Sequence, residues 1–100
     1  MTVFFCRLLP PRPSFLRDIT QEEMAVMQRH AAYWQPSVGS GAVIAMGPVD
    51  DPKGTFGMSI IEAESRAALD ALIRRNPALE LAGAAYEISV MPRGVMRSEH

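Results

Sequence analysis

The order in which strand-like and helix-like segments follow one another constrains this chain most strongly. Segments rich in β-branched and aromatic residues, or alternating between apolar and polar, predict four strands. Two other segments repeat apolar residues at helical spacing and predict two helices. In chain order, we expect a strand at 2–9, a helix from Thr20 to about Gln35, strands at 42–46 and 55–63, a helix at 66–75 and a strand at 85–92. This β-α-β-β-α-β order is typical of the ferredoxin-like α+β sandwich, an antiparallel four-stranded sheet with two helices on one face.

The first predicted helix lies between a capping box and a proline. Thr20 and Glu23 have the spacing at which the hydroxyl accepts from the N3 amide and the carboxylate accepts from the N-cap amide. Pro36 lacks an amide hydrogen, so the regular helix should end or kink near Gln35. One stripe of apolar side chains is expected to face the sheet: Met24, Met27, Ala31 and Trp34.

Turn residues mark the limits of the other elements. The "GSG" at 39–41 comes before a strand and lacks the full dinucleotide spacing, so we interpret it as a turn. Gly47-Pro48 is expected to close the second strand, and Gly57 suggests a bulge or a close backbone approach in the third. Ser65 is a suitable N-cap for the second helix, and Asn76-Pro77 should stop it.

Composition narrows the class of protein. The chain has 100 residues, 48% hydrophobic and 21% charged, which fits one small globular domain at 1–92 with a flexible tail at 93–100. The net charge of −1 and the scattered arginines disfavour nucleic acid as a partner. No stretch approaches a membrane span or a signal peptide, so we expect a cytoplasmic protein.

The sequence contains no pattern typical of a metal or cofactor site. Two distant histidines and one cysteine do not make a spaced zinc site, and no phosphate-binding motif is present, so we expect neither a metal nor a cofactor. Cys6 lies in an apolar run and is expected to be a buried, inert thiol.

Both faces of the predicted sheet are apolar. In the first strand, alternation places Val3, Phe5 and Arg7 on one face and the residues between them on the other. One face would be covered by the helices, and the other would expose a large apolar patch. We therefore expect a homodimer in which two sheets pack face to face.

His30 is the strongest candidate for chemistry. It lies on the shoulder of the apolar stripe, near Glu23 and Trp34 on a helical wheel. Near a cavity, an imidazole at this position could act as a general acid or base. The alternative is a half-buried histidine bonded to a backbone carbonyl.

Five other side chains have a functional and a structural interpretation. Arg7 and Arg12 could hold the charge of an acidic substrate, or could be solvated arginines. Trp34 could pack against a ligand, or fill the core. Asp50 and Asp51 could orient His30, or could simply form the hairpin turn.

The pattern as a whole resembles the YCII-related (YciI-like) family of small dimeric α+β barrel proteins. The resemblance extends from the first strand to Pro92. The segments that carry it are "HAAYW" at 30–34, the glycine turn at 39–41, "GPVDDPKGTFG" at 47–57, "NPALELAG" at 76–83 and "YEISVMP" at 86–92.

This resemblance implies a dimer with one pocket per subunit and a histidine–aspartate pair as acid/base machinery. The family's histidine falls on His30, whereas Asn76 precedes Pro77 where the family has aspartate. An asparagine can accept a hydrogen bond from the imidazole but cannot stabilise its charged form as a carboxylate does. The pair could be weakened, Asp50 or Asp51 could replace the aspartate, or the protein could bind without catalysing.

Two functions remain. The first is a dimeric small-molecule-binding module with a pocket beside His30. The second is an enzyme in which His30 is the general acid or base for proton abstraction or elimination on a small cyclic or acidic molecule.

Overall fold

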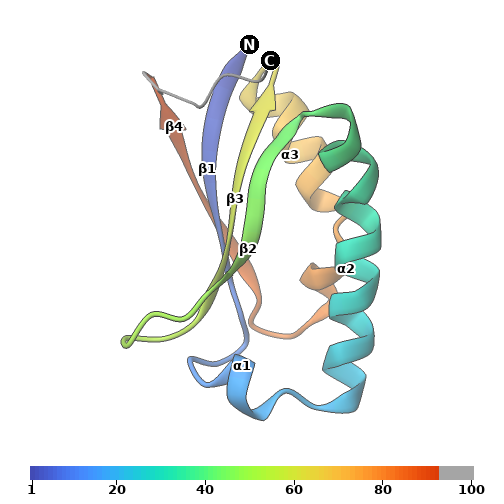
Figure 1. Cartoon of the computed structure of the whole chain (residues 1–100), viewed down its shortest axis with the longest axis vertical. Helices are drawn as coiled ribbons and strands as arrows, with labels where there is room; N and C mark the ends of the chain where they lie inside the picture. The colour runs from blue at the N-terminus through green and yellow to red at the C-terminus, as the bar shows by residue number, and fades with distance from the viewer. Residues whose placement is uncertain (93–100) are drawn as a thin grey trace.

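A four-stranded antiparallel sheet organises the computed structural model, which describes residues 1–92 (Figure 1). The expected tail at 93–100 lies outside the described residues. The strand order is β2-β3-β1-β4. The strands are β1 (Thr2–Leu9), β2 (Val43–Val49), β3 (Phe56–Ala63) and β4 (Ala85–Met91).

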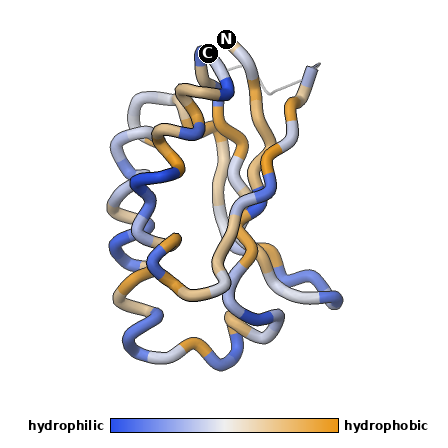
Figure 2. Tube along the Cα trace, turned by 180° about the vertical axis from the view of Figure 1, so that it is seen from behind, coloured by the Kyte–Doolittle hydropathy of each residue, from blue (hydrophilic) through white to orange (hydrophobic). Residues whose placement is uncertain are grey.

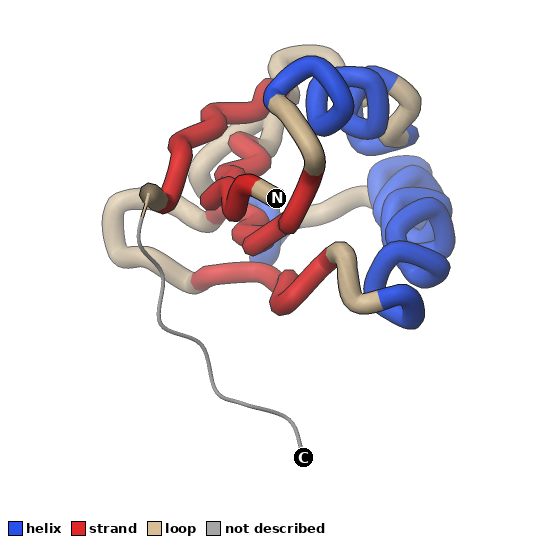
Figure 3. Tube along the Cα trace, turned by 90° about the horizontal axis from the view of Figure 1, so that it is seen from above, coloured by secondary structure: helices blue, strands red, loops and turns tan. Residues whose placement is uncertain are grey.

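Two long helices cover one face of this sheet. They are α2 (Gln21–Ser40) and α3 (Arg66–Arg74), and both lie on the same side of the strands in Figures 1 and 3. The expected ferredoxin-like α+β arrangement is therefore confirmed. Two short elements were not predicted: α1 (Phe15–Asp18) and the 3₁₀ helix η1 (Pro77–Glu80).

Alternating burial shows which strand face meets the helices. In β1, Phe4, Cys6 and Leu8 are buried, whereas their neighbours on the opposite face are half-buried. We call that opposite face, which none of the helices within residues 1–92 covers, the open sheet face. The core under the helices is formed by Phe4, Cys6, Trp34, Val43, Ile61, Ala63, Leu69 and Ile73. In Figure 2, hydrophilic and hydrophobic segments alternate along α2.

The helix α2 is longer than the sequence predicted. Its capping box is confirmed, because Thr20 Oγ1 accepts from the amide of Glu23 at 3.1 Å and the Glu23 carboxylate accepts from the amide of Thr20 at 2.9 Å. The expected end near Gln35 is wrong: the helix passes through Pro36. Pro36 faces solvent there, so the carbonyl it leaves unpaired can bind water. The helix ends instead at Gly41, whose φ of 90° is left-handed.

The strand β2 also extends beyond its predicted end, because Gly47-Pro48 lies within it. A proline fits here because β2 is an edge strand, where one row of backbone groups has no partner. The register shift is in β2 between Val43 and Ala45. Gly57 is not at this shift, and a Cβ there would make an ordinary contact with Leu8 Cβ at 3.4 Å, so the structure shows neither the bulge nor the close approach expected at this glycine.

Candidate functional site

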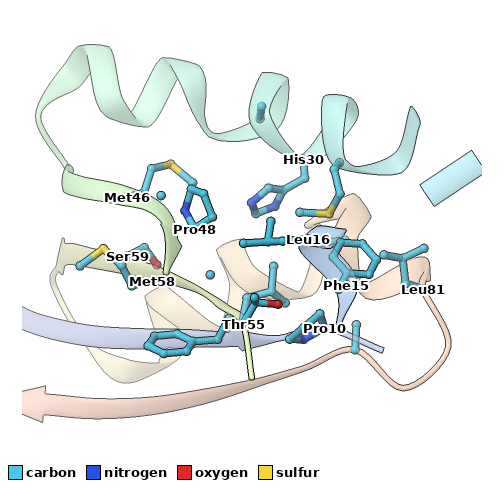
Figure 4. Close-up of a pocket in the computed structure, with 18 of the residues that line it drawn as sticks. Pro10, Phe15, Leu16, His30, Met46, Pro48, Thr55, Met58, Ser59 and Leu81 are labelled. Atoms are coloured by element: carbon cyan, nitrogen blue, oxygen red, sulfur yellow. The ribbon is translucent and has the colours of Figure 1, made fainter. Parts of the chain in front are cut away.

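A pocket of about 580 Å³ opens between the sheet and α2. Figure 4 shows its walls: His30 projects from α2, Met46 and Pro48 come from β2, and Phe15 and Leu16 come from α1. The volume is in the range of small-molecule sites. Most of the lining is apolar, and its polar side chains are His30, Gln35, Thr55, Ser59 and Tyr86.

The pocket exists because the apolar stripe of α2 is only partly packed against the sheet. Trp34 is 2% exposed and lies in the core, whereas Met24, Met27 and Ala31 line the pocket. Met24 is 45% exposed at the same time. The stripe was predicted to lie on the sheet, and the structure places a hollow under its first half. An apolar wall that remains partly open to water is typical of a binding surface.

The loop after β1 closes one side of the pocket. Its prolines Pro10 and Pro11 line the wall, and the short helix α1 inserts Phe15, which is 4% exposed. The carbonyl of Pro13 accepts from the amide of Thr55 at 3.1 Å, which ties this loop to the start of β3. Gly54 permits this contact, because it has a φ of 143° and a Cβ there would lie 3.1 Å from Pro13.

A three-residue hydrogen-bond network lies beside the pocket, and two of its members, His30 and Tyr86, line the wall. Nδ1 of His30 lies 2.8 Å from Oδ1 of Asn76, and Nδ2 of Asn76 donates to the hydroxyl of Tyr86 at 2.6 Å. Asn76 is 3% exposed and is the N-cap of η1, where its Oδ1 also accepts from the amide of Ala78 at 3.1 Å. The network therefore joins α2, the turn after α3, and β4.

These contacts determine which atoms donate. The backbone amide of Ala78 can only donate, so the Asn76 atom facing it must be the oxygen. The same oxygen faces His30, so Nδ1 of His30 carries the hydrogen and donates. Nε2 then keeps its lone pair in the neutral ring, and it has no hydrogen-bond partner among residues 1–92. His30 therefore presents an acceptor in the pocket wall.

The surroundings keep the network uncharged. Burial lowers the pKa of His30 from its ordinary value, and the bond to Asn76 opposes this only in part. Burial likewise raises the pKa of Tyr86 above the ordinary phenol value. At neutral pH, a neutral imidazole and a phenol therefore line the pocket, and the amide of Asn76 joins them from behind the lining.

Arg12 lies outside the pocket lining, and its guanidinium already has partners. It donates to both carboxylate oxygens of Glu23 at 2.7 Å and from Nε to Asp18 at 2.7 Å. These bonds hold the pKa of Glu23 down at about 2. Arg12 also stacks over the ring of Phe15 at 5.3 Å. It thus joins the loop, α1 and the start of α2.

Arg7 lies on the open sheet face, away from the pocket. Its guanidinium is 4.3 Å from the centre of the Phe56 ring and 3.4 Å from the carboxylate of Glu87. Its Nε is buried and has no partner within residues 1–92. The structure therefore does not bring Arg7 or Arg12 to His30.

The two aspartates of the β2–β3 hairpin are also placed away from the network. Asp51 accepts from the amide of Lys53 at 2.8 Å, which is a turn contact, and Asp50 is exposed. The hairpin tip points away from α2 (Figure 1). Among the described residues, the side chain that contacts the His30 ring by a hydrogen bond is Asn76.

Sequence reasoning did not single out Tyr86, Thr55 or Ser59, which supply polar groups to the wall. Alternation in β4 did place Tyr86 on the same face as Ile88, but no local signal linked it to Asn76. Cys6, expected to be buried, has 0% exposure, and burial raises the pKa of its thiol.

Within residues 1–92, none of the helices has the length and apolar character needed to cross a bilayer. In the same range, no three histidine, cysteine or carboxylate side chains gather where they could hold a metal ion. A search of curated proteins found no match. A model of the YCII-related domain matches residues 3–92, and the chain therefore belongs to the YCII-related domain family.

Proposed function

We propose that this protein binds a small organic molecule in the pocket beside His30. The pocket itself carries the proposal: its volume is about 580 Å³, and its wall is mainly apolar. A few convergent polar groups in such a wall are the usual composition of a ligand site. The pocket rim also exposes large apolar side chains, among them Leu16 at 44% and Val38 at 40%.

Filling the pocket tests this proposal. Ala31 is exposed and lines the pocket, so Ala31→Trp should place an indole in it. Ala32 is also exposed and lies on α2, but it is not part of the lining, so Ala32→Trp is a matched control. A small-molecule library is screened by thermal shift. Hits should stabilise wild type and Ala32→Trp but not Ala31→Trp, and equal stabilisation of all three would contradict binding in this pocket.

We also propose that two copies pack through their open sheet faces, which would make the dimeric barrel. Half-buried apolar residues occupy this face, including Phe5, Phe56 and Ile60. Arg7 and Glu87 give it one positive and one negative charge, which a two-fold axis could pair between copies. The Arg7 side chain is 41% exposed in the single chain, so its guanidinium is accessible to a second copy.

Light scattering tests the dimer. Ile60→Glu places a charge in the middle of the open sheet face and should give a monomer. Leu72→Glu, an equivalent change at a 37% exposed residue on α3, should leave the dimer intact. A monomeric wild type at micromolar concentration would overturn this part of the proposal.

Acid/base catalysis is the second candidate function, and the free Nε2 of His30 is the observation that favours it. A neutral imidazole with its lone pair in the pocket can take a proton from a bound molecule. Asn76 then offers the resulting imidazolium an amide oxygen instead of a carboxylate, which stabilises the charge less. Turnover of a library hit that His30→Gln abolishes would support catalysis, whereas a bound and unchanged hit would support the binding module.

A further inference from the structure

The part of the pocket wall formed by residues 1–92 has no permanently charged side chain. Among the described residues that line it, none is an arginine, lysine, aspartate or glutamate. The loop arginine that could have served an acidic ligand, Arg12, is already bonded to Glu23 and Asp18. Transferring an isolated charge into such a wall is costly without a partner. An ionised ligand would therefore lose its hydration on entering the pocket, and no opposite charge in the described lining would compensate for that loss.

The hydrogen-bond network of His30, Asn76 and Tyr86 favours one kind of polar group on the ligand. Asn76 holds the hydrogen of His30 on Nδ1, so Nε2 can only accept while the ring is neutral. A ligand that covers Nε2 with apolar atoms would bury this acceptor without a partner. Leaving a buried acceptor unpaired is unfavourable, whereas an O–H or N–H group on the ligand satisfies it.

Two other hydroxyl groups of the wall, those of Thr55 and Tyr86, already have a hydrogen-bond partner within the protein. The hydroxyl of Thr55 can donate to the carbonyl of Pro13 at 3.3 Å, within the protein. The hydroxyl of Tyr86 accepts from Asn76. The ring nitrogen of His30 is an acceptor in the lining that no other residue of 1–92 satisfies, and a ligand can satisfy it.

We propose that the pocket selects uncharged, mainly apolar ring compounds that carry one O–H or N–H donor for Nε2 of His30, and that it discriminates against carboxylates. This specificity rests on the proposed binding function and adds the chemical class of the ligand. Asn76 acts here as a positioning residue, because it sets the tautomer of His30 without lining the pocket.

Three naphthalene probes of similar size separate these requirements: 2-naphthol is neutral with a donor, naphthalene is neutral without one, and 2-naphthoate is anionic. Calorimetric titration into the wild type at neutral pH should show 2-naphthol binding about tenfold more tightly than naphthalene, as expected for one hydrogen bond. 2-Naphthoate should bind more weakly than both. His30→Phe, which keeps a ring but removes the acceptor, should abolish the preference for 2-naphthol over naphthalene.

The possible failures are distinguishable. If 2-naphthoate binds as tightly as 2-naphthol, or if 2-naphthol has no advantage over naphthalene in the wild type, the specificity is overturned while ligand binding stands. These comparisons need no variant, so they hold even if His30→Phe does not fold. If none of the probes binds, the inferred ligand class is wrong, and the Ala31→Trp and Ala32→Trp comparison decides the binding function separately.

Discussion

The imidazole of His30 and the side-chain amide of Asn76 face each other across 2.8 Å, between α2 and the turn that follows α3. The pair occupies positions where the YCII-related family resemblance implies histidine and aspartate. The amide retains the geometry of such a pair, because its oxygen accepts from Nδ1. It does not retain the charge, and burial then disfavours the imidazolium. The resulting site is a neutral acceptor aimed at an apolar pocket.

Asn76→Asp should raise the pKa of His30. A carboxylate at this position stabilises the imidazolium, and it can still accept from the amide of Ala78 while the Tyr86 hydroxyl turns to donate to it. Titration of the His30 ring by NMR measures the change. Asp51→Asn is the control, because the hairpin carboxylate lies away from this ring and its removal should leave the His30 titration unaltered. A response to Asp51→Asn that matched the response to Asn76→Asp would contradict the assigned pair.

Stability should rise with pH as His30 loses its proton in the unfolded chain. Its folded pKa is lowered, so between that pKa and about 6.5 the unfolded state binds more protons than the folded state. The contribution is complete above about pH 6.5 and is lost as the pH falls below it. Urea unfolding from pH 5 to 8 should show a shallower dependence for His30→Gln than for wild type. Identical profiles would mean that burial of His30 does not affect its protonation.

Those features of the fold that depend on neighbouring residues could be predicted from the sequence. The alternation in β1 predicted which residues share a face, because side chains of a strand alternate between faces. Thr20 and Glu23 predicted the start of α2, because a capping box is made within four residues. The element ends predicted at Pro36 and Pro48 were wrong, because the free-energy cost of a proline depends on its surroundings. Pro36 faces solvent, and Pro48 lies on an edge strand.

The site itself was only partly predictable. His30 was identified as a shoulder residue on the helix, and its contact with Asn76 was suggested by family resemblance. The contact between Asn76 and Tyr86 joins a turn to β4 and has no local signature. The pocket depends on where α1 comes to lie, and that in turn depends on bonds from Arg12 to partners 6 and 11 residues away. Such contacts join residues that are brought together only by folding, so the local sequence does not reveal them.

Thr20→Ala should lower the free energy of unfolding by about 1 kcal/mol, the usual cost of losing an N-cap side chain. The hydroxyl satisfies the amide of Glu23 at the start of α2, and alanine leaves that amide without this partner. Thr20→Ser keeps the hydroxyl and should retain most of the stability. Urea denaturation compares the three proteins, and an equal loss for serine and alanine would show that the hydroxyl is not responsible.

Trp34→Ala should lower the free energy of unfolding by about 3–5 kcal/mol, because it removes a large side chain that is 2% exposed. The indole lies in the core and packs edge-on against Tyr33, with ring centres 5.1 Å apart. Met24→Ala, on the same apolar stripe but 45% exposed over the pocket, should cost much less. Urea denaturation measures both. A small loss at Trp34, equal to that at Met24, would mean that the indole belongs to the pocket surface and that the packed part of the stripe begins elsewhere.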